Sequence, residues 1–233
     1  MTRFVEVAET GSTNADLASL AAGGAEEGLW LRADRQTAGR GRQGRAWTSP
    51  TGNFYGSTLV RLRPSDPPPA SLSLVAGVAL HEAAGAYLAD PVPLTLKWPN
   101  DLLLSNAKLA GILLERVEQA VIVGIGVNLA HAPDLPDRPT ATLASAVSPS
   151  DFAQTLAAAF ERWLGRWRGE GLGAIREAWL ARAHAAGTAL RLHAPDSEAI
   201  EGLFDGLAED GALRLRLADG RGRVIHAGDV FLI

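Results

Sequence analysis

The pattern of apolar residues changes near residue 186, and this change constrains the fold more than any other feature of the chain. Before it, strand-like runs alternate with stripes of helical spacing. After Gly187, four or five short strands alternate with turns, several of them Asp-Gly pairs, which is typical of a small β-barrel. We therefore predict one larger domain over residues 1–186 and a small β-barrel domain over residues 187–233.

The larger segment is predicted to mix strands and helices. Strand patterns cover residues 4–7, 29–33, 52–63, 91–98 and 121–129, with a hairpin over 102–115. Helical patterns follow the Ser12-Thr13-Asn14 cap and cover residues 71–88, 150–167 and 172–182.

Composition excludes several classes of function. The 233-residue chain carries a net charge of −4, whereas domains that grip nucleic acid through their overall field are usually basic. The absence of cysteine excludes disulfides and thiolate chemistry, and the five histidines are scattered without zinc-ligand spacing. No signal peptide is visible, and no apolar run approaches the roughly 20 residues of a membrane span. We expect a soluble cytoplasmic protein.

The most informative stretch is Gly39-Arg40-Gly41-Arg42-Gln43-Gly44-Arg45. Glycines let the backbone approach a ligand closely, and arginines offer fork-shaped donors for carboxylate or phosphate. Taken alone, the run fits a solvated basic loop or an RNA-contacting tail equally well. Because it lies between two predicted strands and is followed by Trp47, we favour an anion-binding loop inside the fold.

Three further segments carry weaker signals. Lys97-Trp98-Pro99-Asn100-Asp101 ends a strand, where Asn can bind a base or sugar and Asp can hold magnesium, although taken alone the segment favours a plain turn by about two to one. In the strand Lys108 to Glu115, alternation sends Lys108 to the face of Ala110 and Ile112. Gly124 to Asn128 is an apolar strand with two glycines, which indicates either a close approach or a bulge. Neither a dinucleotide fingerprint nor a Walker loop is present.

Together and in this order, these segments resemble the biotin–protein ligase family. The matching positions are Ser12 to Asn14, Gln36-Thr37, Gly39 to Arg45 with Trp47, Lys97 to Asp101, Lys108 to Glu115 and Gly124 to Asn128. The resemblance implies an α+β fold with a central mixed β-sheet flanked by helices, as in class II synthetase-like ligases, followed by a small SH3-like β-barrel. Residues 1–186 are then the biotin- and ATP-binding catalytic domain.

The resemblance also implies a two-step reaction. Biotin and ATP form biotinyl-5′-AMP, assisted by Mg²⁺, and a lysine of the biotin carboxyl carrier domain of a carboxylase then accepts the biotin. The family includes homodimers. Some members add an N-terminal DNA-binding domain, for which we expect no room here because the matching pattern begins by residue 11. We therefore expect no DNA binding.

Residue roles follow from the same resemblance. Ser12, Thr13, Asn14 and Gln36 match positions at the ureido ring of biotin. Arg40, Arg42 and Lys108 match the catalytic positions, with Arg42, Arg45 and Lys108 near the α-phosphate and carboxylate. Asn100 and Asn128 match the nucleotide side, and Asp101 is the magnesium candidate. The remaining ligand-binding positions are Gly39, Gly41, Trp47, Gly111 and Gly126.

One departure and three alternatives stand beside this interpretation. Some members contact adenine through an arginine near the C-terminus, whereas this chain ends in Val230-Phe231-Leu232-Ile233. A lipoate–protein ligase shares the chemistry, but its paired-arginine and paired-glycine signature is missing. A nucleic-acid-binding module is disfavoured by the negative charge and by an aromatic content of 6%. A biotin sensor without catalysis is the third alternative.

Overall fold

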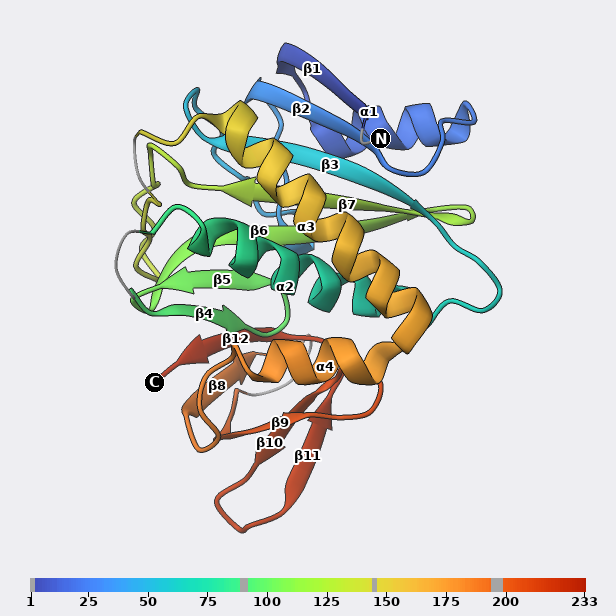
Figure 1. Ribbon diagram of the computed structural model, residues 1–233. Helices are drawn as coiled ribbons and strands as arrows, with labels where there is room; N and C mark the ends of the chain where they lie inside the picture. Colours follow the sequence, from blue (N-terminus) through green and yellow to red (C-terminus); the bar gives the residue numbers. More distant parts are fainter. Residues whose placement is uncertain (1–2, 89–91, 144–145, 194–198) are drawn as a thin grey trace.

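The computed structural model describes residues 3–88, 92–143, 146–193 and 199–233 (Figure 1). Seven strands form one mixed sheet in the order β1-β2-β3-β7-β6-β5-β4. They are β1 (Arg3–Thr10), β2 (Leu29–Gln36), β3 (Phe54–Arg61), β4 (Leu94–Lys97), β5 (Asp101–Leu104), β6 (Ala107–Val117) and β7 (Ala120–Val127). Only β1 and β2 run parallel among these neighbours. The predicted mixed sheet is confirmed.

The alternation of side chains along β7 determines what covers each face of this sheet. Val121, Val123 and Ile125 belong to the main core, which they share with the long helices α2 (Leu72–Gly85) and α3 (Pro149–Glu170). Figure 1 shows these two helices crossing the same face. Ile122 belongs to a smaller core with the short helix α1 (Thr13–Ala22) on the opposite face. The glycines of β7 continue on this second face, which is left largely open.

The second sheet has five antiparallel strands in the order β11-β10-β9-β8-β12. They are β8 (Ala189–His193), β9 (Ile200–Leu207), β10 (Leu213–Arg216), β11 (Gly222–Ile225) and β12 (Asp229–Leu232). Helix α4 (Leu172–Leu180) leads into this sheet, and the main-chain N–H of Leu96 donates to Arg182 O at 2.8 Å. The arrangement agrees with the predicted small barrel-like unit. Its treatment as a domain starting at residue 187 stays a prediction.

The turn residues of the second sheet divide into two kinds. Gly211 and Gly220 have φ of 88° and 83° and lie between strands, as the Asp-Gly pairs predicted. The turn predicted at Asp205-Gly206 is wrong, because this pair lies inside β9. The register of β9 against β10 shifts at this point, and Gly206 has a φ of 87°, so the pair forms a bulge that bends the strand.

The strand expected over 91–98 begins at a residue outside the described ranges and is observed over Leu94–Lys97. The other strands of the large sheet, and the helices that pack against it, lie within a few residues of their predicted positions. Within the described ranges, no helix has the length and apolar character needed to cross a membrane.

Candidate active site

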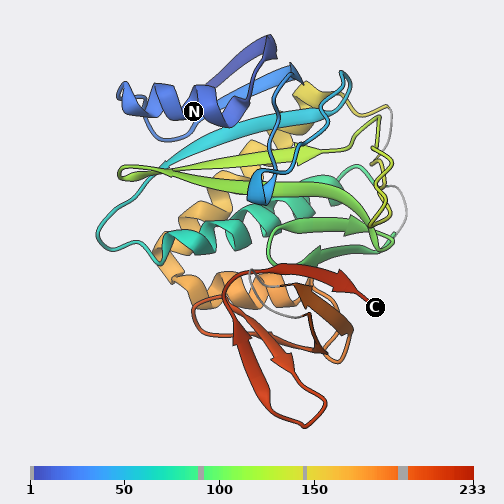
Figure 2. The ribbon, with the colours of Figure 1, turned by 180° about the vertical axis from the view of Figure 1, so that it is seen from behind.

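The face of the large sheet opposite α2 and α3 carries a pocket. Figure 2 shows the molecule from behind, with this face of the sheet toward the viewer. Its floor comes from β6 and β7, and its walls come from the start of α1, residues 40–48, residues 133–140 and the start of β12. Elements far apart in sequence therefore meet at one place, including a strand of the second sheet.

Residues 39–47 form a hairpin over the pocket, which we call the Arg/Gly hairpin. The Trp47 N–H donates to Gly39 O at 2.9 Å, and Gly44 turns the chain with a φ of 72°. A Cβ at Gly39 would lie 2.6 Å from Trp47 O, so this position accepts only glycine if the hairpin is to close. Gly39 therefore shapes the hairpin and is not part of the pocket lining.

A network of amide and hydroxyl groups forms the end of the pocket near α1. Gln36 Oε1 accepts from Thr13 N at 2.9 Å and from Thr13 Oγ1 at 3.1 Å. Asn14 Nδ2 donates to Glu115 Oε2 at 2.6 Å, and its Oδ1 accepts from Ser57 Oγ at 2.6 Å. These bonds fix the side chains in place, which suits recognition of a polar ring by hydrogen bonds.

The side chain of Ser12 does not cap helix α1, although the sequence predicts a cap there. Ser12 occupies the N-cap of α1, but its side chain makes no capping hydrogen bond. The hydroxyl instead belongs to the pocket lining, next to the Thr13–Gln36 contact.

The two glycines of β7 lie where side chains from other elements press on the sheet. A Cβ at Gly124 would be 2.1 Å from Asn14 Oδ1, and a Cβ at Gly126 would be 2.6 Å from the Trp47 ring. The pairing of β7 is regular on both sides here, so the alternative of a bulge is wrong. The side chains that approach β7 closely are Asn14 and Trp47. Because the two glycines carry no Cβ, these side chains can lie against the floor of the pocket.

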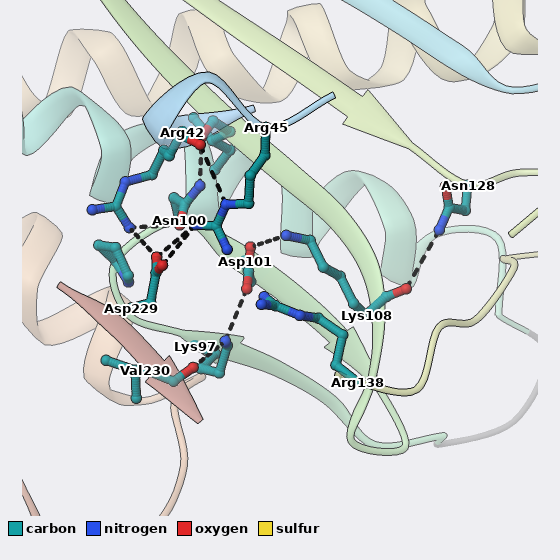
Figure 3. A network of polar contacts seen from close by, with 12 residues as sticks. Arg42, Arg45, Lys97, Asn100, Asp101, Lys108, Asn128, Arg138, Asp229 and Val230 are labelled. Carbon is teal, nitrogen blue, oxygen red and sulfur yellow. Dashed lines mark hydrogen bonds and ion pairs between the residues drawn. The ribbon is translucent and has the colours of Figure 1, made fainter. Parts of the chain in front are cut away.

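Two lysines and one carboxylate form a buried cluster at the centre (Figure 3). Lys97 Nζ lies 2.9 Å from Asp101 Oδ2, and Lys108 Nζ lies 2.6 Å from Asp101 Oδ1. Lys97 Nζ also donates to Val230 O of β12 at 2.7 Å. Burial alone raises the pKa of Asp101, but the two ammonium groups outweigh it and hold that pKa well below its usual range. Burial lowers the pKa of Lys108, and Asp101 opposes that shift.

The orientation of Lys108 corrects one expectation from strand alternation. Ala110 is fully buried on the helix side, whereas Lys108 lines the pocket. The pairing of β5 with β6 shifts register at this point, which breaks the simple alternation. Lys108 therefore lies beside Gly111, where a Cβ would be 3.5 Å from Lys108 Cε.

Two arginines of the hairpin, Arg42 and Arg45, contact the second sheet (Figure 3). Arg45 Nη2 donates to both carboxylate oxygens of Asp229, at 2.7 and 2.8 Å. Arg42 Nη1 donates to Gly228 O at 3.2 Å and to Asn100 Oδ1 at 3.4 Å. The second sheet thus holds Arg42 and Arg45 above the pocket.

Asn100 and Asn128 are held by main-chain carbonyls. Asn100 Nδ2 donates to Ile112 O at 2.7 Å, and Asn128 Nδ2 donates to Lys108 O at 3.4 Å. Asn100 thereby presents its oxygen to Arg42, while Asn128 is 2% exposed at the edge of the lining.

Asp101 does not fit the predicted role of magnesium ligand. Each carboxylate oxygen already lies within ion-pair distance of a lysine, and a cation there would face two ammonium groups. In the described part of the chain, no group of three or more His, Cys, Asp or Glu residues is arranged to hold a metal. The chain offers lysines at this position in place of acidic ligands.

The structure brings the sequence-predicted residues together with the single exception of Gly39. The pocket is lined by Ser12, Thr13, Asn14, Gln36, Arg40, Gly41, Arg42, Arg45, Trp47, Asn100, Asp101, Lys108, Gly111, Gly126 and Asn128. Sequence reasoning missed Ser57, Glu115, Arg138 and Asp229. Glu115 closes the Lys108 to Glu115 motif but was given no role, and the other three residues lie outside the motifs. The Gly228-Asp229 pair indicated only a turn.

Comparisons with known proteins agree with this geometry. The model described as the Biotin/lipoate A/B protein ligase family matches residues 8–129, and that of the Biotin protein ligase C terminal domain matches residues 191–233. The Biotin--[acetyl-CoA-carboxylase] ligase of Paracoccus denitrificans is 43% identical over 239 residues, covering 97% of this chain and 98% of that protein.

Two solved structures extend the likeness to the fold. Biotin protein ligase from Aquifex aeolicus in complex with biotin and ATP superposes with a TM-score of 0.87 at 25% identity, covering 100% of both chains. Biotin protein ligase from Leishmania major in complex with Biotinyl-5-AMP has a TM-score of 0.70 at 26% identity, covering 97% of this chain and 98% of that one.

The chain therefore belongs to the biotin/lipoate A/B protein ligase family. The C-terminal match and the full-length relatives place it among the biotin–protein ligases rather than the lipoate enzymes, and it is a ligase in the enzymatic sense.

Proposed function

We propose that the pocket joins biotin to ATP and then transfers biotin to a lysine of a biotin carboxyl carrier domain. The observation that supports this proposal is that the two ends of one pocket differ in chemistry. Amide and hydroxyl groups around Asn14 and Gln36 suit the ureido ring, and Arg42, Arg45 and Lys108 suit the carboxylate and phosphates. The Aquifex and Leishmania relatives were solved with biotin and ATP and with biotinyl-5-AMP, which supports the same substrates here.

The first step forms a mixed anhydride. A carboxylate oxygen of biotin attacks the α-phosphorus of ATP, and the bond to the leaving pyrophosphate breaks. Lys108 and the hairpin arginines stabilise the charge that concentrates around this phosphorus, because they are already oriented by Asp101 and Asp229. The protein contributes positioning and electrostatics, and no covalent enzyme intermediate is needed.

The second step uses the acceptor lysine. Its amine attacks the acyl carbon, AMP leaves, and the nitrogen loses a proton as the amide forms. The relative in Paracoccus is named for acetyl-CoA carboxylase, which supports the carrier domain of a carboxylase as the acceptor. We place the reaction in the cytoplasm, where ATP is available.

The experiment that tests the function measures pyrophosphate release from ATP with and without biotin. We expect release only when biotin is present, followed by transfer of labelled biotin to an apo carrier domain. Release that depends on lipoate would indicate the sister activity. Biotin binding without turnover would indicate a sensor, and either result would overturn the ligase proposal.

Substitution of Gly124 by Ala tests the polar end of the pocket. The new Cβ would fall 2.1 Å from Asn14 Oδ1, so Asn14 must leave its place. We expect biotin affinity to fall about tenfold and the free energy of unfolding to fall by about 1–3 kcal/mol, as in overpacked cores. Biotin titration and denaturant unfolding measure the two effects.

The matched control is Gly165→Ala in α3, where a Cβ would meet nothing within 4 Å. We expect it to leave biotin binding unchanged and to raise the free energy of unfolding by up to about 1 kcal/mol, since Ala favours helix over Gly. Normal biotin affinity in Gly124→Ala would contradict the assignment of the Asn14 end to the biotin ring.

A further inference from the structure

Arg138 enters the pocket from a segment that none of the motifs covers. It belongs to residues 133–140, which follow β7 and form the wall facing the second sheet. This segment is fixed by its main chain. The Lys108 N–H donates to Pro139 O at 2.8 Å, and the Ala141 N–H donates to Lys108 O at 2.9 Å. These bonds place Arg138 close to Lys108.

The side chain of Arg138 is held on two sides. Its Nε donates to Asp137 Oδ2 at 3.0 Å, and its guanidinium carbon lies 5.0 Å from the centroid of the Phe231 ring on β12. The side chain is 16% exposed. Among the described residues, its Nη1 group has no hydrogen-bond partner, although a guanidinium carries five N–H donors. The side chain of Arg138 is thus held in place while the N–H donors of its Nη1 group are available to a ligand.

The charge of Arg138 acts on the central cluster. Figure 3 shows its side chain pointing toward Asp101. Asp137 chiefly raises the pKa of Arg138, with smaller contributions from Asp101 and Asp229, so the guanidinium stays charged. Arg138 in turn contributes to the lowered pKa of Lys108, behind the larger effect of burial. Lys108 on the floor and Arg138 on the adjoining wall are thus two neighbouring cations, and a bound anion would relieve their repulsion.

We propose that Arg138 binds a phosphate group of the nucleotide, from the side of the pocket opposite the hairpin arginines. The proposal rests on the proposed function and adds a residue that the matching motifs do not contain. Phosphate suits a guanidinium backed by an aromatic ring and left with free in-plane donors.

The position of Arg138 separates this role from biotin recognition. Arg138 contacts Phe231 of the second sheet and adjoins Lys108 at the start of β6. The amide end of the pocket lies further along β6, where Asn14 bonds to Glu115. Loss of Arg138 should therefore affect ATP and pyrophosphate and leave biotin binding unchanged.

The test compares the full-length protein with Arg138→Gln, Arg138→Ala and Arg138→Lys. The matched control is Arg191→Gln, which removes an arginine of β8 that pairs with Phe231 in the sheet register and forms an exposed ion pair with Glu201. Biotin-dependent pyrophosphate release gives the KM for ATP and for biotin, and added pyrophosphate gives its inhibition constant. Thermal unfolding monitors the fold.

For Arg138→Gln we expect the KM for ATP and the pyrophosphate inhibition constant to rise about tenfold, as for loss of one charged hydrogen bond. The KM for biotin and the melting temperature should match those of the control, and Arg138→Lys should recover part of the loss. An unchanged KM for ATP, or an equal rise in both KM values, would overturn the phosphate role while the parent still turns over. If the parent itself releases no pyrophosphate with biotin, the proposed function fails first.

Discussion

Substitution of Asp101 by Asn is expected to lower the free energy of unfolding at neutral pH by about 3–5 kcal/mol, the usual loss when one partner of a buried ion pair is removed. The carboxylate is 5% exposed and lies between Lys97 and Lys108, whose side chains are 9% and 15% exposed. The amide leaves two buried ammonium groups facing each other without a counter-charge. Denaturant unfolding of parent and variant at several pH values measures the change.

The pH dependence of this loss has a defined sign. The pKa of Asp101 is lowered in the folded state, so its ionised form stabilises the fold above the unfolded pKa of about 3.9. That contribution disappears as the pH falls from there through the folded pKa. The difference between parent and Asp101→Asn should therefore be full at pH 7 and shrink in acid.

An exposed pair supplies the control for Asp101. Asp205 lies 2.7 Å from Arg214, with side-chain exposures of 35% and 51%. Asp205→Asn should change the free energy of unfolding by less than about 1 kcal/mol. If Asp101→Asn is as stable as Asp205→Asn, the lysine cluster does not depend on the carboxylate. Asp101→Asn should also slow adenylation, because Asp101 is the group that opposes the lowered pKa of Lys108.

Local patterns predicted the individual strands and helices, whereas the mixed sheet and the pocket residues were implied by the resemblance to biotin–protein ligases. Strand alternation and helical stripes are local signals, and Val121, Val123 and Ile125 meet the helices as their spacing predicts. The Arg/Gly run and the paired glycines of β7 are also local, because they record where the backbone must allow a close approach. The order of these motifs along the chain then indicated one shared site.

The residues that were missed act across long sequence separations. Asp229 lies 184 positions after Arg45, and its short segment carries only the pattern of a turn. Glu115 and Ser57 bond to Asn14 because the strands β3, β7 and β6 are neighbours, which the sequence does not specify. The register shift at Lys108 likewise depends on how β5 pairs with β6. Such features follow from tertiary pairing rather than from local propensity.

The same pairing explains why the magnesium prediction for Asp101 does not fit. Asp at the end of a strand is a reasonable oxygen ligand when its neighbours are unknown. In the fold, Lys97 comes from the preceding strand and Lys108 from the following one, and both reach the same carboxylate. The chemistry of the position is set by these two contacts.

Substitution of Arg42 by Ala is expected to release biotinyl-5′-AMP about 100-fold faster than in the parent. Arg42 spans the pocket to Gly228 O and Asn100 Oδ1, and it lies 3.7 Å from Asp229, so it ties the Arg/Gly hairpin to both sheets. Loss of charged hydrogen bonds of about 1.5–3 kcal/mol each corresponds to this range of rates. Retention of labelled intermediate during gel filtration, followed by transfer to an apo carrier domain, measures the leak.

Arg35→Ala is the matched control for this variant, because Arg35 forms an exposed ion pair with Glu9 at 2.9 Å and lies outside the pocket lining. It should retain the intermediate like the parent. We expect the hairpin also to exclude water from the hydrolysable anhydride, so Arg42→Ala should yield more free biotin and AMP per transferred biotin. If Arg42→Ala retains biotinyl-5′-AMP as tightly as Arg35→Ala, the hairpin does not act as a lid, even though the chain's place in the family is unaffected.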